Sequence, residues 1–151
     1  MRALVQRVSE GGVYISANNY SADIKRGLVI LLGIKTGDTI EDSVYIADKC
    51  TNLRVFEDSD QKMNISLKDI SGEVLIISQF TLYGDTSKGN RPGFTDAAKP
   101  DEAIPLYEKF IKRMKENLGE RKVKTGIFGA MMQVIIVNDG PVTLLVESKE
   151  T

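Results

Sequence analysis

Two short apolar runs constrain the fold of this chain more than any other feature. The first covers residues 28–34 and is preceded by Gly27. The second, at residues 74–77, lies inside the segment 73–79 and follows Gly72. Continuous apolar runs of this length, set off by glycine, are typical of strands with little access to water. Both segments are therefore predicted to be strands, and the first is expected to be buried on both faces.

Further strands are predicted towards both ends of the chain, where apolar and polar residues alternate. They are expected at residues 1–8, 13–15, 20–24, 54–56, 133–137 and 142–146. The pair Gly11-Gly12 is predicted to separate the first two of these strands. The turn-forming pair Asn18-Asn19 is predicted to join the second and third as a hairpin.

A first amphipathic helix is predicted at residues 40–53. Thr39 and Asp42 have the spacing of a capping box, which marks a helix start. The apolar stripe recurs at helical spacing and comprises Ile40, Val44, Ala47 and Thr51, widened by Ile46, Cys50 and Leu53. This stripe is expected to face the core.

A second helix is predicted to begin at Asp101, its expected N-cap, with Pro105 tolerated in the first turn. Gly119 is expected to end it. Its apolar positions follow the same three- and four-residue spacing, at Tyr107, Phe110, Ile111, Met114 and Leu118. The segment before this helix, residues 84–100, has no periodicity, and a loop of that length is usually functional or disordered.

Two main helices among seven or eight strands indicate an α+β fold. The clustering of strands at both chain ends favours a largely antiparallel, partly closed β-sheet or barrel. The chain has 151 residues, enough for one sizeable core, and shows no internal repeat or boundary. Residues 1–151 are therefore expected to form a single domain.

The chain contains no histidine and one cysteine, Cys50. The lack of histidine excludes Ser-His-Asp and Cys-His catalysis and histidine-containing zinc sites. A lone cysteine cannot form an internal disulfide and, within a helix, is expected to be a buried apolar residue. A hydrolase of this composition must move protons with hydroxyls, carboxylates, lysine, backbone groups or the substrate itself. No metal or other cofactor is expected.

The net charge of −1 means that any contact with nucleic acid depends on local basic clusters. Lys88 and Arg91 in the long loop could meet RNA phosphates, although this loop lacks the Lys-Ser/Thr pair of a triphosphate-binding loop. A second basic stretch comprises Lys109, Lys112, Arg113, Lys115, Arg121, Lys122 and Lys124. Acidic neighbours balance this stretch, so a solvated helix face is an equal alternative.

No secretory signal and no run long enough to span a bilayer is recognised. The lone cysteine also fits a reducing compartment. The protein is therefore expected to be cytoplasmic and not to associate with a membrane.

A candidate site lies where the second buried strand meets the long loop, at Ser78-Gln79-Phe80-Thr81-Leu82. Polar groups at the end of a buried strand are held rigidly and often face a site. Thr81 and Ser78 could donate hydroxyl hydrogen bonds, and exposed N–H groups could stabilise an oxyanion. The alternative is structural: Phe80 and Leu82 fill the core while Thr81 bonds to nearby backbone.

A second candidate segment is Asn138-Asp139-Gly140-Pro141, between the last two predicted strands. Its residues accept left-handed conformations and predict a plain hairpin connection. Only the Gly-Pro pair suggests more, because an X-Pro bond can be cis.

Together these two segments, the second continuing through Val142-Thr143, resemble the two signature motifs of D-aminoacyl-tRNA deacylases. The resemblance extends along the chain through Gln6-Arg7-Val8, Leu31-Leu32-Gly33, Lys62-Met63-Asn64, Arg91-Pro92 with Phe94, Thr125-Gly126 with Phe128-Gly129, and Met132-Gln133-Val134. Either motif alone is weak. Both, in this order and spacing, make a specific match.

The resemblance implies hydrolysis of the ester bond of D-aminoacyl-tRNA by a homodimer with active sites at the subunit interface. Ser78, Gln79 and Thr81 are the implied catalytic residues, and with Phe80 they would line a pocket for the 3′ aminoacyl-adenosine. Whether glycine mischarged on tRNA is also a substrate stays open.

The second motif is implied to act across the dimer. Gly140-Pro141, with a cis bond, would reach from one subunit into the other's pocket. Arg7 and Met132 would hold that segment or line the site.

An aminoacyl ester is already activated, so its hydrolysis needs positioned water and oxyanion stabilisation more than a strong base. Metal-independent catalysis is expected, because the chain has no histidine and no cluster of thiolates. Covalent catalysis by Thr81 is less favoured, since no partner base can be identified. Two alternatives stay open: a non-catalytic RNA-binding or assembly module that uses the basic helix and loop, and an esterase for a small molecule.

Overall fold

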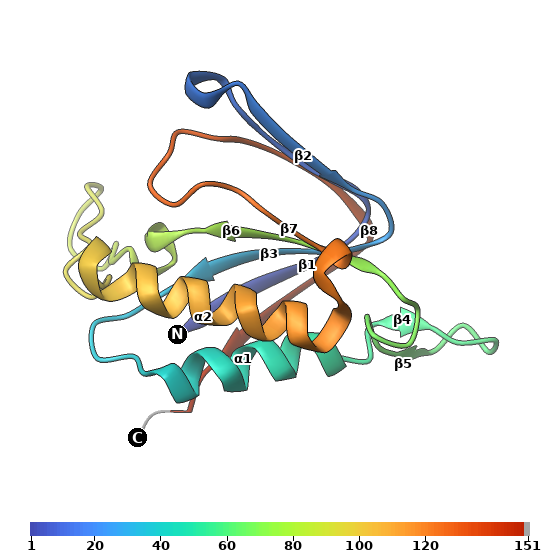
Figure 1. Cartoon of the computed structure of the whole chain (residues 1–151). Coiled ribbons are helices and arrows are strands. Elements are labelled where there is room, and N and C mark those ends of the chain that lie inside the picture. The colour runs from blue at the N-terminus through green and yellow to red at the C-terminus, as the bar shows by residue number, and fades with distance from the viewer. Residues whose placement is uncertain (150–151) are drawn as a thin grey trace.

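The computed structural model describes residues 1–149, and Figure 1 shows how their strands and helices are arranged. The strands are β1 (Arg2–Ile15), β2 (Tyr20–Ile24), β3 (Gly27–Gly33), β4 (Phe56–Glu57), β5 (Met63–Ile65), β6 (Glu73–Ser78), β7 (Val123–Thr125) and β8 (Gln133–Glu147). The helices are α1 (Ile40–Asn52), α2 (Pro100–Leu118) and the short 3-10 helices η1 (Ser16–Asn18), η2 (Phe80–Tyr83) and η3 (Glu120–Lys122).

Strand β1 is the centre of the sheet, because it pairs antiparallel with three other strands. β3 and β2 follow one another along one of its edges, and β8 runs along the opposite edge. β6 pairs parallel with β3, and β7 pairs parallel with β6. The sheet curls until the Tyr20 hydroxyl of β2 donates to the Thr125 carbonyl of β7 at 2.7 Å. The predicted α+β fold with a largely antiparallel, partly closed sheet is confirmed; the parallel part is β3-β6-β7.

The apolar strand β3 divides its side chains between two cores. Leu28, Ile30 and Leu32 enter a core shared with both α-helices, whereas Val29 enters a second core enclosed by the curled sheet. All four are 0–1% exposed, and β6 alternates in the same way. Burial on both faces removes the need for polar residues, which explains the unbroken apolar run.

Helices α1 and α2 lie together on one face of the sheet (Figure 1). The predicted capping box starts α1: the Thr39 hydroxyl accepts from the Asp42 N–H, and the Asp42 carboxylate accepts from the Thr39 N–H. The two helices are joined by the Ser43 hydroxyl, which donates to the Leu106 carbonyl at 3.0 Å.

The start of α2 differs from the prediction. The helix begins at Pro100 with Lys99 as its N-cap, so Asp101 lies in the first turn and does not cap, and Pro105 lies inside the helix. Proline is favoured at the first helical position because its missing N–H has no helical partner there. The prediction underestimated Pro100 as a helix-starting residue.

The predicted break at Gly11-Gly12 is wrong, since β1 runs unbroken through both glycines. A Cβ added to Gly11 would lie 2.7 Å from the Val29 side chain, and one on Gly12 would lie 2.8 Å from Asp23. These glycines therefore permit close packing on a strand that is paired on both edges, and they do not form a turn.

The predicted hairpin at residues 138–141 is also wrong. Both flanking segments belong to β8 and pair with the same strand, β1. On β1 only Arg7 lies between the partners of Asn138 and Thr143, so residues 139–142 form an enlarged bulge. The Gly140-Pro141 bond at its tip is cis, as the family resemblance implies.

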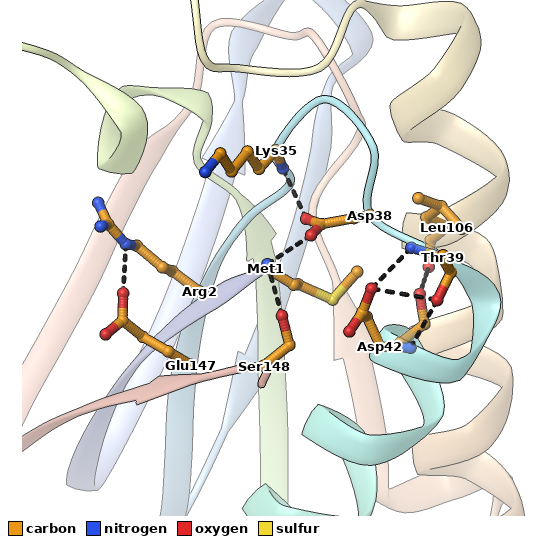
Figure 2. Close-up of polar contacts among 10 residues, drawn as sticks. Met1, Arg2, Lys35, Asp38, Thr39, Asp42, Leu106, Glu147 and Ser148 are labelled. Carbon is orange, nitrogen blue, oxygen red and sulfur yellow. Dashed lines mark hydrogen bonds and ion pairs between the residues drawn. The ribbon is translucent and has the colours of Figure 1, made fainter. Parts of the chain in front are cut away.

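The start of β1 with the preceding Met1, and the end of β8 with the following Ser148, meet in a polar cluster, which Figure 2 shows. The Met1 ammonium donates to Asp38 at 2.7 Å and to Ser148 at 2.8 Å, and Arg2 pairs with Glu147 at 2.6 Å. These contacts tie both long strands to the loop that follows β3. Within residues 1–149, no helix has the length and apolar character needed to cross a bilayer.

Candidate active site

A cavity of about 310 Å³ opens at the carboxyl ends of the parallel strands β3 and β6. Ligands commonly bind at this edge of parallel strands. The walls come from the strand ends, from the start of α2 and from the segment between β7 and β8. They comprise Leu32, Ile34, Ile77, Ser78, Gln79, Phe80, Ala98, Ala103, Phe128, Gly129, Ala130, Met131, Met132 and Val134.

The end of β6 and the turn η2 carry the polar groups of the site. The Gln79 N–H donates to the Leu32 carbonyl at 2.8 Å, which continues the ladder between β6 and β3. The Gln79 side-chain amide then donates to the Thr81 hydroxyl. Because the Thr81 oxygen receives this hydrogen, its own O–H can be donated to a water or a substrate.

The rim of the cavity is apolar and aromatic. Phe80 is 57% exposed and meets Phe94 of the long loop edge-on, with ring centroids 5.1 Å apart. Met131, which also lines the cavity, is 92% exposed. Exposed aromatic and thioether surface beside a cavity is suited to flat ligands such as nucleobases.

None of the described side chains that line the cavity is ionisable. The ring of Tyr107 packs on the cavity residue Phe128. Its hydroxyl donates to the Ile76 carbonyl at 3.2 Å, and burial raises the pKa of this tyrosine above its ordinary value. Burial likewise raises the pKa of the Cys50 thiol to about 12, so Cys50 is not a thiolate nucleophile at neutral pH. The described cavity wall therefore offers hydrogen-bonding groups but no side-chain base.

Within residues 1–149, no cluster of three or more His, Cys, Asp or Glu side chains is arranged to hold an ion.

The bulge of β8 is anchored to the buried side chain of Arg7. Arg7 is 7% exposed; its Nε donates to the Asp139 carbonyl at 2.9 Å and its Nη1 to the Val55 carbonyl at 2.8 Å. Gly140 has a φ of +136°, and a Cβ there would lie 3.0 Å from Arg7 Nη2. Glycine is therefore required at this position, both for backbone conformation and for space.

The predicted site residues fall into two groups. The cavity is lined by Ser78, Gln79, Phe80 and Met132. Thr81 does not line it but is hydrogen-bonded to the side chain of Gln79. A second group lies outside the cavity wall and consists of Arg7, Gly140 and Pro141.

Lys88 and Arg91 belong to neither group. Both side chains are exposed in the long loop, which is closed by paired backbone hydrogen bonds of 2.7 and 2.9 Å between Asp85 and Gly93. These hydrogen bonds give the loop a defined conformation. It lies beside the cavity, because Phe94 at its base contacts the cavity residue Phe80.

Sequence reasoning missed several cavity residues. Ala98 and Ala103 at the start of α2 are small and leave space for a ligand, but an alanine in or beside a helix carries no signal of its own. Phe128 was part of the family resemblance without an assigned role. In the structure it lines the cavity and packs on Tyr107, with centroids 5.6 Å apart.

The family model described as D-Tyr-tRNA(Tyr) deacylase matches residues 4–147 of the chain. The chain belongs to this family. A D-aminoacyl-tRNA deacylase of Thermotoga petrophila is 53% identical over 150 residues, covering 99% of both chains. A protein of the same name from Salinibacter ruber is 55% identical over 149 residues, covering 99% of this chain and 98% of the relative.

Two solved structures share the fold of this chain. The structure of a protein named c-Myc DNA Unwinding Element Binding Protein is 39% identical, with a TM-score of 0.92, and the match covers 99% of this chain and all of that one. A probable eukaryotic D-amino acid tRNA deacylase is 17% identical, with a TM-score of 0.85, over 97% of this chain and 98% of that one, and shows the shared fold.

Proposed function

We propose that this chain hydrolyses the ester bond of D-aminoacyl-tRNA and releases a free D-amino acid and tRNA. The observation that carries the proposal is the cavity at the end of β6. It combines the Ser78–Thr81 motif with an aromatic rim and has no ionisable wall among the described residues. Membership of the deacylase family supports the same activity.

The chemistry needs little more than placement of water and stabilisation of charge. The Thr81 hydroxyl, oriented by Gln79, can hold the attacking water or the substrate. Backbone N–H groups of η2 and the Ser78 hydroxyl can donate to the developing oxyanion. The neighbouring ribose hydroxyl of the terminal adenosine can assist the proton transfer that the protein's side chains do not supply.

The active form is proposed to be a homodimer that pairs through β8. Before its bulge, this edge strand turns a row of apolar side chains outward: Ile135 is 58% exposed and Val137 44%. Exposed apolar rows on a long edge strand are typical of interaction surfaces. Gly140 and Pro141 lie on the same strand, are exposed and do not line their own chain's cavity.

Gly140-Pro141 of one subunit is therefore proposed to enter the partner's cavity and reject L-amino acids. A rigid backbone can exclude the Cβ of every L-residue, whatever its side chain, and leave D-residues unaffected. Glycine has no Cβ and should escape this filter. Met132 lines the cavity that receives the aminoacyl group, and Lys88 and Arg91 are proposed to contact phosphates of the tRNA in the cytoplasm.

The direct test is to incubate the purified protein with matched D- and L-aminoacyl-tRNA and to follow ester hydrolysis. Selective loss of the D-ester supports the function, whereas equal or absent hydrolysis of both contradicts it. Glycyl-tRNA in the same assay shows whether the filter admits an achiral substrate.

Complementation tests the shared site. A mixed dimer of one Thr81→Ala and one Gly140→Ala protomer contains one fully native composite cavity only if the subunits exchange their bulges. About half of the wild-type activity is then expected per mixed dimer. No recovery would mean that each site is built from one chain.

A second candidate function is a non-catalytic nucleic-acid-binding module. It is favoured by the similarity to the 39% identical structure, whose name is that of a DNA-element binding protein. Tight binding of DNA or tRNA without hydrolysis of any aminoacyl ester would support this candidate over the deacylase.

A further inference from the structure

The bulge of β8 departs far from the β1 ladder. Gln6 pairs with Thr143 and Val8 with Asn138, so the single residue Arg7 faces four residues, 139–142. The ladder cannot hold those four residues in place, and other contacts must do so.

One end of the bulge is held by Arg7, which lies opposite the bulge on β1. The guanidinium donates to the Asp139 carbonyl at 2.9 Å. This contact fixes the first residue of the bulge and leaves Gly140, Pro141 and Val142 to be held by something else.

The other end is held by the side chain of Asn138. Its Oδ1 accepts from the Val142 N–H at 2.9 Å, which closes the bulge across Gly140-Pro141. Its Nδ2 donates to the Thr143 hydroxyl at 3.0 Å and to the Gln6 side-chain oxygen. The Thr143 hydroxyl also donates to the same Gln6 oxygen at 3.2 Å, so the brace is anchored to both strands.

We propose that Asn138 is a positioning residue that sets where Gly140-Pro141 projects, and thereby sets the discrimination between D- and L-substrates. The proposal rests on the proposed chiral function of Gly140-Pro141. Asn138 acts through Val142 and need not touch the substrate. Asn138 is suited to this role because its one side-chain amide can accept from Val142 in the bulge and at the same time donate to Thr143 of β8 and Gln6 of β1.

Two substitutions separate the brace from general packing. Asn138→Ala removes every contact of the amide. Asn138→Asp keeps an oxygen for the Val142 N–H, and Gln6 can turn its own amide to donate to the new carboxylate. As a control, Asn117→Ala removes another amide that bridges two partners, Asp48 at 2.8 Å and Thr51 at 3.1 Å, between α1 and α2.

Hydrogen exchange of the Val142 amide tests the brace without any assay of activity. Asn138→Ala should speed this exchange about tenfold or more, because the N–H loses its acceptor, while Asn138→Asp stays within about threefold of wild type. Unchanged exchange in Asn138→Ala would overturn the proposed brace.

Kinetics then test its consequence. The ratio of kcat/KM for D- over L-aminoacyl-tRNA should fall about tenfold in Asn138→Ala and recover in Asn138→Asp. Asn117→Ala should lower Tm and leave the ratio unchanged. A lowered Tm with an unchanged ratio in Asn138→Ala would overturn the positioning role. Wild-type protein that hydrolyses neither ester would instead overturn the proposed function, while the exchange experiment still decides the brace.

Discussion

At the scale of single residues, the proposed site centres on the Thr81 hydroxyl, which accepts a hydrogen bond from the Gln79 side chain. This bond leaves the Thr81 proton available for donation to a water or a substrate. The described cavity wall offers no ionisable side chain that could turn Thr81 into a strong nucleophile. Thr81 is therefore expected to orient water or substrate rather than to form a covalent intermediate.

Thr81→Ala should lower kcat about 10- to 100-fold and leave a measurable rate, since the backbone donors and the substrate's ribose hydroxyl remain. Thr81→Ser, which keeps the hydroxyl, should retain most of the activity. Rapid quenching and mass spectrometry should find no acyl group on the enzyme. A trapped acyl adduct on Thr81 would revive covalent catalysis.

Metal independence is a second prediction at this scale. Activity should survive exhaustive treatment with EDTA, because the proposed mechanism relies on hydrogen bonds from Thr81, Gln79 and the backbone. The assay needs Mg²⁺ returned to all samples, since tRNA folding depends on it. Activity lost to EDTA and restored by zinc alone would contradict this mechanism.

At the scale of elements, α1 and α2 are joined by a polar cluster. Arg113 donates to the Asp48 carboxylate at 2.7 and 3.0 Å, and Asn117 donates to it at 2.8 Å. Hydrogen bonds from Arg113, aided by Asn117, hold the pKa of Asp48 below its ordinary value despite partial burial. The pair is partly exposed, so its contribution to stability is modest.

Asp48→Asn should lower Tm by about 1–3 °C at pH 7. A lowered carboxylate pKa stabilises the folded state above the ordinary pKa of aspartate, and this contribution is lost as the pH falls through the folded value. The difference in Tm between wild type and Asp48→Asn should therefore shrink as the pH falls below about 4. A difference that stays constant from pH 7 to pH 3 would show that the charge of Asp48 is not responsible.

At the scale of the whole molecule, β8 combines three tasks. Its inner side chains Val134 and Ile136 pack against the second core, its outward row is exposed, and its bulge carries Gly140-Pro141. One edge of β8 pairs with β1, whereas its other edge pairs with no strand of residues 1–149. The proposed dimer would bury the outward row and complete both active sites at once.

Ile135→Glu should therefore dissociate the proposed dimer and at the same time abolish most of the activity. Burying an unpaired carboxylate in an apolar interface is strongly unfavourable. Ile40→Glu is the matched control, because Ile40 at the start of α1 is 55% exposed, close to the 58% of Ile135. Analytical ultracentrifugation should show a lower molecular mass, and the deacylation assay a lower rate, for Ile135→Glu but not for Ile40→Glu. A fully active wild-type monomer would remove the cross-subunit site.

The sequence by itself determined the local structure wherever one periodicity or one motif was decisive. The unbroken run at residues 28–34 became a strand buried on both faces, and the capping box at Thr39 marked the start of α1 correctly. The strand-end motif at Ser78–Thr81 was recognisable as a candidate site because its polar residues follow a buried strand, and Ser78, Gln79 and Phe80 do line the cavity. In each case the causes lie within a few consecutive residues, so they are visible without the fold.

Only the tertiary structure decided what depends on partners far along the chain. The pair Gly11-Gly12 suggested a break in the strand. In the structure, both glycines lie within β1, where the close approach of Val29 and Asp23 leaves no room for a Cβ. The segment 138–141 has the composition of a hairpin turn, but pairing of both its flanks with β1 makes it a bulge. Turn-forming residues permit an irregular backbone, and the neighbouring strand determines which irregular form results. For the same reason, the anchoring of the bulge by Arg7 and Asn138 could be found only in three dimensions.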